Sequence, residues 1–498
     1  DIMQEKNEKK PTQRKKREPG SARKAHARRI DNKWEIFATG LFFVAVFVTM
    51  IAYLGYFTAT SKQEMLDNSY NSRQEILLSR NYRGNIYSRD GEVLAETVPD
   101  ERQNESRVYP FADMFAHIVG YSTKGRMGVE AMANYYLITT STSLSNVAAN
   151  DTAGVKNPGD NVYTTLDVQI QEVADSQLNI YKGAVVVTEV STGKILAMVS
   201  HPDFDPNQIG EIWDSLVENE NSSVLLNRAT QGQYPPGSTF KIITALEYIR
   251  ENPDTYNDYS YQCSGAFTSM GSQINCYHKT NHGQVDFKSS FARSCNASFA
   301  NIGMGLNREM FRETLDGLLF NQPLPLDLPH STGKDTISAD STTDEMLQTS
   351  IGQGKTQISP MHLNMITSAI ANNGVLMKPY VIDHVENDVG RVVKSFSPES
   401  CGQLIDPSEA EILRDMMTAV VEGGTARKLS GLSYTAAGKT GSAEYNNYGD
   451  SHAWFTGYAP AEAPEVCVTI IVEGAGSGGD YAVPIARRIF DAYFNEKK

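Results

Sequence analysis

A serine and a lysine that lie three residues apart, Ser238 and Lys241, are the main candidates for nucleophilic catalysis in this sequence. Pro235-Pro236-Gly237 precedes them and cannot continue a helix, whereas apolar residues recur at helical spacing from Ile242 to Ile249. We therefore expect Ser238 in the first turn of a helix, with the side chain of Lys241 beside it. The four-residue pattern alone is also explained by a capping serine followed by a surface lysine.

Two further motifs could supply what a serine nucleophile needs. A lysine acts as a base only when it is neutral for part of the time, which burial and nearby cations favour. Ser294-Cys295-Asn296 begins 56 residues after Ser238, and Lys439-Thr440-Gly441 begins 145 residues after Ser294. The second motif falls on an expected strand, where Gly441 would let a substrate backbone approach closely. Taken singly, the Ser-x-Asn motif is also typical of a turn, and the Lys-Thr-Gly motif is also typical of an edge strand with a surface lysine.

A second cluster contains three cysteines and a histidine at spacings of 13, 6 and 13 residues: Cys263, Cys276, His282 and Cys295. Three thiolates and one imidazole are a typical closed ligand set for structural zinc. The alternatives are a Cys263–Cys276 disulfide with a free Cys295, or three unrelated buried thiols, and His278 is the rival imidazole. The chain has five cysteines, so they cannot all pair with one another. The remaining two are expected to be incidental: Cys401 and Cys467.

An uncharged stretch of 22 residues at 36–57 is long enough for a helix that crosses a hydrocarbon core of about 30 Å. It is longer than a typical signal-peptide core, so we expect an uncleaved membrane anchor. Residues 1–35 carry 12 Lys and Arg against 6 Asp and Glu, which predicts a cytoplasmic tail and an extracytoplasmic remainder. A buried core helix, the alternative, would not need this charge contrast. Residues 36–498 carry 33 basic against 53 acidic residues, which argues against nucleic acid as a partner.

The elements that must position these motifs are strands near both ends of the extracytoplasmic sequence and helices between them. Asp167 is expected to cap the helix that follows the first strand. The expected strands are 162–166, 184–190, 195–199, 434–444, 453–458 and 466–473, and the expected helices are 168–178 and 483–493, with helices dominating 238–380. Strands from both ends predict one central antiparallel sheet flanked by helices, which is an α+β (mixed α/β) fold.

A smaller module is expected between the anchor and this sheet. A hairpin is predicted within 83–95, a helix at 130–137, and a loop or hinge at 141–160, which is rich in Ser, Thr, Asn and Gly. The expected regions are therefore a basic cytoplasmic tail at 1–35, a transmembrane anchor at 36–57, a stalk and β-containing pedestal module at 58–160, and a catalytic domain at 161–498.

The order Ser-x-x-Lys, Ser-x-Asn, Lys-Thr-Gly resembles that of the penicillin-recognising serine enzymes, in which these motifs line one cleft. Shorter segments resemble class B penicillin-binding proteins over nearly everything from Arg83 to the C-terminus: 83–86, 89–91, 125–130, 164–167, 192–198, 205–207, 227–228, 352–354 and 454–460. The resemblance implies a penicillin-binding transpeptidase fold. It also implies a D,D-transpeptidase that cross-links peptidoglycan at the outer face of the cytoplasmic membrane, is inhibited by β-lactams and needs no cofactor for its chemistry.

The resemblance assigns roles to the first two motifs. Ser238 would be acylated by the D-Ala-D-Ala end of a stem peptide, with release of D-Ala and transfer to an amine of a neighbouring strand. Lys241 would be the base for acylation. Ser294 would relay a proton toward the leaving amine, and Asn296 would hold Lys241 and the substrate amide.

The third motif would bind the end of the substrate. Lys439 would attract the terminal carboxylate and Thr440 would bind it, next to Gly441. The backbone N–H groups of Ser238 and Ser442 would form the oxyanion hole, where loss of one donor typically costs about 2.7–4 kcal/mol. Ser442 stands where many relatives have threonine, which leaves this backbone role intact.

The resemblance also bears on the metal and on partners. Some elongation-type class B members have metal ligands at corresponding positions, which favours structural zinc at the cysteine and histidine cluster. A polytopic glycosyltransferase of the SEDS type is the implied protein partner. The alternative from another class is a membrane-anchored β-lactam sensor without transpeptidase turnover, and a single span with a short basic tail argues against it. A bifunctional class A enzyme would need more than the roughly 100 residues between anchor and catalytic domain.

Overall fold

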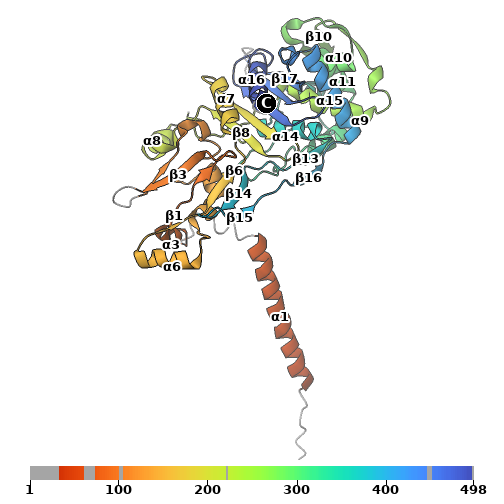
Figure 1. Cartoon of the computed structure of the whole chain (residues 1–498). Helices are drawn as coiled ribbons and strands as arrows, with labels where there is room; N and C mark the ends of the chain where they lie inside the picture. Colours follow the sequence, from red (N-terminus) through yellow and green to blue (C-terminus); the bar gives the residue numbers. More distant parts are fainter. Residues whose placement is uncertain (1–32, 61–72, 100–104, 220–221, 446–450, 496–498) are drawn as a thin grey trace, which may run out of the picture. The chain divides into compact units, whose positions relative to one another are not determined.

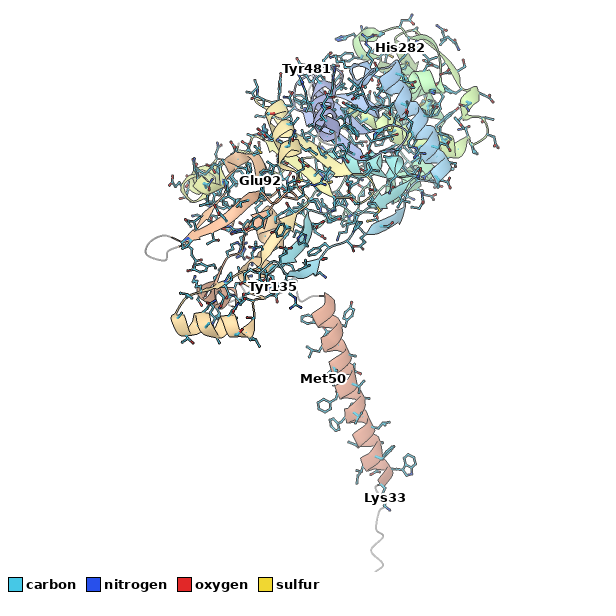
Figure 2. The ribbon with its side chains drawn as sticks, in the orientation of Figure 1. Lys33, Met50, Glu92, Tyr135, His282 and Tyr481 are labelled. Carbon is cyan, nitrogen blue, oxygen red and sulfur yellow. The ribbon has the colours of Figure 1, made fainter. Side chains whose placement is uncertain are left out.

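The computed structural model describes residues 33–60, 73–99, 105–219, 222–445 and 451–495 (Figure 1). The chain divides into two compact units, residues 1–63 and residues 64–498. The first unit contains helix α1 (Lys33–Thr60), in which the stretch Lys33–Phe57 is long and apolar enough to cross a membrane. Its large apolar side chains are exposed and project on every side of the helix (Figure 2). This pattern fits a helix surrounded by lipid.

A five-stranded antiparallel sheet is the centre of the second unit, with the strand order β17-β18-β19-β7-β8. Its strands are β7 (Gly183–Glu189), β8 (Ile195–His201), β17 (Ala437–Glu444), β18 (Ser451–Ala459) and β19 (Val466–Val472). Strand β19 pairs with β7, so the sheet is assembled from segments that lie far apart in the sequence. The prediction of one antiparallel sheet built from both ends is confirmed, except that the expected strand at 162–166 belongs to another sheet. Strands β7, β18 and β19 are almost entirely buried, as their continuous apolar runs predict.

Helices flank this sheet. Helix α14 (Pro360–Ala371) is buried along nearly its whole length and bonds to the sheet through threonines, as in the 2.7 Å contact between Thr367 and Thr456. Helices α7 (Val168–Leu178) and α16 (Ala482–Asn495) pack against each other and against strands of the same sheet. Helix α7 has the predicted bounds because the Asp167 carboxylate accepts a hydrogen bond from the N–H of Ile170.

The part of the chain between β8 and β17 contains most of the other helices: α8 (Ile209–Glu218), α9 (Lys241–Glu251), α10 (Phe287–Ala292), α11 (Asn296–Gly305), α12 (Arg308–Gly317), α13 (Thr343–Ser350) and α15 (Pro407–Glu422). Within 260–286, the expectation of helices across 238–380 overlooked four short strands: β9 (Ser260–Cys263), β10 (Ala266–Ser269), β11 (Ser272–Asn275) and β12 (Gly283–Asp286). These strands are only four residues long and largely polar, so they carry a weak sequence signal. They position the cysteine cluster.

The pedestal module contains a six-stranded sheet in the order β15-β14-β6-β2-β3-β4. Its strands are β2 (Ile86–Tyr87), β3 (Val93–Pro99), β4 (Glu105–Val108), β6 (Asn161–Thr164), β14 (Ile382–Glu386) and β15 (Val392–Ser395). Strands β2 and β3 confirm the predicted hairpin. The last two strands come from much later in the chain, so this sheet joins the module to the rest of the second unit. Shorter elements complete the fold: α3 (Arg73–Arg80), β1 (Asn81–Tyr82), β5 (Asn157–Pro158), β13 (Val375–Met377) and β16 (Ser400–Gln403).

Two predictions for the module were wrong in detail. The expected loop at 141–160 contains helix α6 (Leu144–Ala153), which Ser143 caps and which ends at Gly154 with φ 67°. The segment is rich in Ser, Thr, Asn and Gly, which are common both in loops and at helix ends, so its composition did not indicate the helix. The expected helix at 130–137 consists of two short helices, α4 (Gly128–Met132) and α5 (Asn134–Ile138).

A buried ion cluster holds the module together. The Glu130 carboxylate is fully buried and accepts hydrogen bonds from Arg83 and Arg107, each at 2.7 Å. Burial raises the pKa of Glu130, but the two arginines outweigh it and hold the pKa below its usual value. Removing one arginine would leave a buried charge under-compensated, which is strongly destabilising.

Candidate active site

Ser238 lies in a 3₁₀ turn, η3 (Gly237–Phe240), which leads directly into α9. The prediction of a helical start is therefore confirmed, with a tighter first turn than an α-helix. Gly237 has φ 54°, its N–H donates to the carbonyl of Gly352 at 2.8 Å, and a Cβ there would lie 2.9 Å from the Cβ of Ala443. The turn before the serine is thus pressed against β17, and only glycine fits there.

Lys241 is fully buried and its Nζ is surrounded by oxygen atoms. It donates to Ser238 Oγ at 3.1 Å, to Asn296 Oδ1 at 2.6 Å and to the Ser294 carbonyl at 2.8 Å. Burial lowers the pKa of Lys241 to about 7. A large fraction of this lysine is therefore neutral near pH 7, which is the condition for removing a proton from the serine.

The second motif forms the wall opposite Ser238. Ser294 lies between α10 and α11 with φ 57°, an uncommon conformation for a residue other than glycine. Its hydroxyl receives hydrogen bonds from Lys241 at 3.2 Å and from Lys439 at 3.0 Å. Asn296 begins α11 and donates to the carbonyl of Asn275 at 2.9 Å. The Ser294 hydroxyl thus connects the two lysines.

The third motif lies on strand β17, at the edge of the sheet. Lys439 is fully buried, and burial together with the neighbouring charge of Lys241 lowers its pKa well below the usual range. A Cβ at Gly441 would lie 3.0 Å from the Thr239 methyl and 3.1 Å from the Pro236 carbonyl. The close packing of the nucleophile turn on the strand therefore favours glycine here, a reason that the sequence alone did not suggest.

Thr425 was not identified from the sequence. Its hydroxyl lies 2.5 Å from that of Thr440, so two threonines from different elements face the cleft together. Thr425 belongs to the turn after α15, and its only local signal is the Gly-Gly pair that precedes it. Its position beside Thr440 depends on how α15 packs against β17.

These residues line an open cleft of about 1480 Å³. The cleft is bounded by the Ser238 turn, the wall of Ser294 and Asn296, and the exposed edge of β17 with Thr440, Gly441 and Ser442. The structure therefore brings together the three motifs, although up to 201 residues separate Ser238 from Lys439 in the sequence. A cleft of this size has room for an extended peptide.

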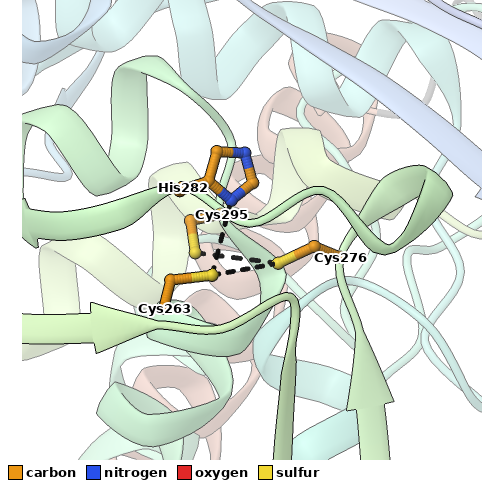
Figure 3. Close-up of side chains that lie close together, drawn as sticks. All are labelled: Cys263, Cys276, His282 and Cys295. Carbon is orange, nitrogen blue, oxygen red and sulfur yellow. Dashed lines mark hydrogen bonds between the residues drawn. The ribbon is translucent and has the colours of Figure 1, made fainter.

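The side chains of the cysteine cluster point toward one another (Figure 3). Two of them, Cys276 and His282, also line the cleft. The Sγ atoms of Cys263 and Cys276 are 3.7 Å apart, those of Cys276 and Cys295 are 3.8 Å apart, and His282 Nδ1 is 3.5 Å from Cys263 Sγ. A disulfide has a sulfur–sulfur distance of about 2.05 Å, so these thiols are free. The four ligand atoms all lie within 4.8 Å of one another.

The structure also distinguishes the two candidate histidines. The exposed ring of His278 packs on Tyr277, and His278 is not part of the cluster that the described residues form. Cys295 lies between Ser294 and Asn296, and Cys276 follows Asn275, whose carbonyl binds Asn296. The cluster is therefore covalently adjacent to the catalytic wall. Cys401 is exposed and Cys467 is buried, and neither belongs to it.

A second group of possible ligands occurs in the described residues, formed by Asp175, His201 and Asp203. The His201 ring bonds to Asp175 at 2.8 Å and to Asp203 at 3.2 Å, and its other nitrogen bonds to the carbonyl of Asn179. Both ring nitrogens thus have protein partners. We interpret this group as an ion-pair cluster of the fold.

Comparison with known proteins identifies the family. Residues 183–491 match the penicillin binding protein transpeptidase domain, and residues 83–162 match the penicillin binding protein A dimerisation domain. The chain is 30% identical over 456 residues to the peptidoglycan D,D-transpeptidase PbpA of Mycolicibacterium smegmatis, which covers 85% of this chain and 91% of that relative. It is 28% identical over 430 residues to the peptidoglycan D,D-transpeptidase MrdA of Haemophilus influenzae, covering 77% of this chain and 65% of that relative.

Solved structures agree with this match. Penicillin-binding protein A from Mycobacterium tuberculosis, solved as a ceftriaxone acyl-enzyme complex, is similar with a TM-score of 0.76 and 28% identity, over 84% of this chain and 99% of that one. A serine, a buried lysine and a strand-borne Lys-Thr-Gly in one cleft, together with these matches, lead to one conclusion. The chain belongs to the penicillin-binding protein transpeptidase family.

Proposed function

We infer that this protein is a peptidoglycan D,D-transpeptidase that forms an acyl-enzyme and is inhibited by β-lactams. The observation that carries this inference is the fully buried Lys241, which contacts Ser238 Oγ at 3.1 Å with a pKa lowered to about 7. The relatives that cover most of the chain carry the same activity in their names, and one is known as a β-lactam acyl-enzyme.

We assign the reaction to the residues around this lysine. Neutral Lys241 removes the hydroxyl proton while Ser238 Oγ attacks the penultimate D-Ala carbonyl, and the oxyanion develops toward the backbone N–H groups of Ser238 and Ser442. Ser294 connects the two lysines and returns a proton to the departing D-Ala amine. An amine from a second stem peptide then attacks the acyl-enzyme by the reverse proton path, which releases Ser238.

Binding of the substrate end is assigned to β17. Thr440, with the Thr425 hydroxyl 2.5 Å from its own, binds the terminal carboxylate in this proposal, and Lys439 attracts that carboxylate when the lysine is protonated. Asn296 both orients Lys241 through its oxygen and faces the cleft. Thr425 is the addition that the structure suggests to the residues found by sequence.

The decisive experiment compares the wild-type protein with the Ser238→Ala variant. The wild type should bind a labelled penicillin covalently, one per chain, and should release product from a D-Ala-D-Ala stem peptide or from a thioester analogue. Ser238→Ala should lose both while it keeps its thermal unfolding temperature. Stoichiometric penicillin binding by the wild type without any turnover of the stem peptide would contradict the enzyme and favour a sensor.

We further propose that Cys263, Cys276, His282 and Cys295 bind a structural zinc ion. Sulfur ligands at about 2.3 Å from a tetrahedral zinc lie about 3.8 Å apart, and the sulfur–sulfur distances of 3.7 and 3.8 Å agree with this arrangement. Three backbone N–H groups point to the sulfurs, at 3.4 to 3.5 Å. Such bonds stabilise thiolates. When bound, zinc would supply a cross-link and no chemistry, since all four positions are protein ligands.

We propose a membrane topology on the basis of the charge distribution along the sequence. The basic tail at 1–35 is cytoplasmic, the anchor at 36–57 spans the membrane, and residues 58–498 are extracytoplasmic. Within the latter, we propose that a pedestal at 58–160 supports a transpeptidase domain at 161–498. A SEDS-type glycosyltransferase is the proposed protein partner, contacting the span and the pedestal.

A further inference from the structure

The exposed edge of β17 presents backbone groups to the cleft at every second residue. Strand β17 is the last strand of its sheet and, among the described residues, pairs only with β18, so alternate residues point their N–H and C=O groups outward. The Thr440 carbonyl faces Lys439 Nζ at 3.0 Å, and the Ser442 carbonyl faces the Gly237 position. By the two-residue period, Glu444 is the next outward position.

Gln353 occupies that next position. Its side-chain amide faces the backbone of Glu444 with both polar atoms, and one orientation of the amide satisfies both. In it the nitrogen donates to the Glu444 carbonyl and the oxygen accepts from the Glu444 N–H, each at 3.2 Å. A residue of a neighbouring antiparallel strand would make the same two bonds with its own N–H and C=O groups.

The loop that carries Gln353 is held by other bonds. The Gly352 carbonyl accepts from the N–H of Gly237 at 2.8 Å, and the N–H groups of Gly352 and Gln353 donate to carbonyls of α13 at 2.8 Å each. The loop position therefore does not depend on the Gln353 side chain. That side chain is half-buried and lines the cleft, so it can leave Glu444 without disturbing the loop.

The direction of a bound donor peptide follows from the proposed function, on which this inference rests. The terminal carboxylate belongs near Thr440, and the scissile carbonyl belongs near the N–H groups of Ser238 and Ser442. The chain on the amino side of the scissile bond then continues along β17 toward Glu444. Extended peptides add to exposed sheet edges in this way.

We propose that the amide of Gln353 is a displaceable occupant of the peptide-pairing position at Glu444, and that the residue on the amino side of the penultimate D-Ala must displace it to pair with β17. Gln353 is then a specificity-determining residue, because it limits how many residues of the donor stem form hydrogen bonds with β17. Short donors and penicillins pair only as far as Ser442 and leave Gln353 in place. Longer donors exchange two protein hydrogen bonds for two substrate hydrogen bonds and gain little from their extra length.

The test uses the full-length protein with Gln353→Met, which keeps side-chain length and removes both hydrogen-bonding atoms. Two thioester donors with the same leaving group are compared, one with a single acylated D-Ala and one extended by two further stem residues. We expect KM for the long donor to fall by about threefold or more relative to KM for the short donor, as the loss of one or two competing hydrogen bonds predicts, with kcat for the two donors changing in parallel. The matched control is Gln273→Met, an exposed glutamine of the same cleft whose amide donates to Asn275 and not to β17, and it should leave this ratio of KM values unchanged.

If the ratio of KM for the long donor to KM for the short donor stays the same or rises in Gln353→Met, the proposal is overturned. An equal loss with both donors, or slower penicillin acylation, would also overturn it, because both show that Gln353 braces the loop. Binding of the long stem peptide to the Ser238→Ala chain, with and without Gln353→Met, gives a Kd that does not depend on turnover. Tighter binding in the double variant supports the proposal even if the wild type turns over no donor, so failure of the proposed activity is recognised separately.

Discussion

At the scale of single residues, the reactivity of Ser238 depends on a lysine that is buried without a carboxylate partner. Lys241 bonds to neutral oxygens, of Ser238, Ser294 and Asn296, and the nearby Cys295 and Cys276 offset only part of the cost of burying its charge. The same arrangement that holds the lysine in place therefore keeps its pKa low. The charge of Lys241 in turn helps burial to lower the pKa of Lys439.

The rate of acylation by a penicillin should rise with pH across neutrality. Lys241 acts as a base only when deprotonated, and its pKa is about 7, so the rate should increase about tenfold from pH 6 to pH 9 with a midpoint near pH 7. Stopped-time labelling of Ser238 measures this profile. Thermal unfolding recorded at each pH serves as the control for loss of folded protein, and a flat profile would contradict the role given to Lys241.

At the scale of elements, the nucleophile turn η3 is held between strand β17 and the 352–354 loop. Gly237, Gly352 and Gly441 permit these backbones to approach, and each would place a Cβ within 3.1 Å of a neighbouring element. The catalytic geometry is therefore a property of packing between elements, and their contacts should be sensitive to single methyl groups.

Gly352→Ala should lower both stability and acylation. Gly352 has φ 74°, and a Cβ there would lie 2.1 Å from the Gly237 carbonyl, so the nucleophile turn must shift. Gly91→Ala is the matched control, because Gly91 has φ 86° but no atom within 4 Å of the added carbon. The control should cost only the strain of the left-handed conformation, about 1–2 kcal/mol, with normal acylation. Equal losses in both variants, measured by denaturant unfolding and penicillin labelling, would refute this account.

The hairpins β9–β12 should depend on the proposed zinc. Metal analysis should find about one zinc per chain, and a strong chelator should lower the unfolding temperature by more than about 4 °C and slow penicillin acylation, because Cys295 lies between Ser294 and Asn296. Cys276→Ser should reproduce both effects, whereas Cys401→Ser, outside the cluster, should not. Purified protein with far less than one zinc per chain, or with a mass that indicates a disulfide, would remove the metal.

At the scale of the whole molecule, the chain combines an apolar helix with a compact unit of residues 64–498. The catalytic cleft and the pedestal belong to the same compact unit, because strands β14 and β15 return from the catalytic part to complete the pedestal sheet. Strand β14 follows α14 in the chain, so this connection links the pedestal sheet to the region around α14.

The topology can be tested with a native reporter. Cys401 is the one exposed cysteine of the five, and the others are buried. A membrane-impermeant maleimide should label Cys401 in right-side-out vesicles and should fail to label it in sealed inverted vesicles. Cys401→Ser should abolish the signal. Labelling confined to inverted vesicles would reverse the proposed orientation.

The sequence by itself determined the features that depend on local pattern. Helix α7 begins after its Asp167 cap, the hairpin of β7 and β8 follows from two apolar runs with a turn between them, and 36–57 lies within α1. The spacing of Ser238 and Lys241 was enough to predict their contact, because one helical turn separates them. The three motifs indicated the family, and the comparisons agree.

Only the tertiary structure decided what depends on segments that are distant in the chain. It brought Lys439 within 3.0 Å of Ser294, paired Thr425 with Thr440, selected His282 over His278, and set Gln353 against Glu444. Periodicity and capping act over a few residues, whereas these contacts depend on sheet order and helix packing, which no local pattern encodes. The short polar strands β9–β12 were missed for the same reason, since their stability comes from their neighbours and not from their own residues.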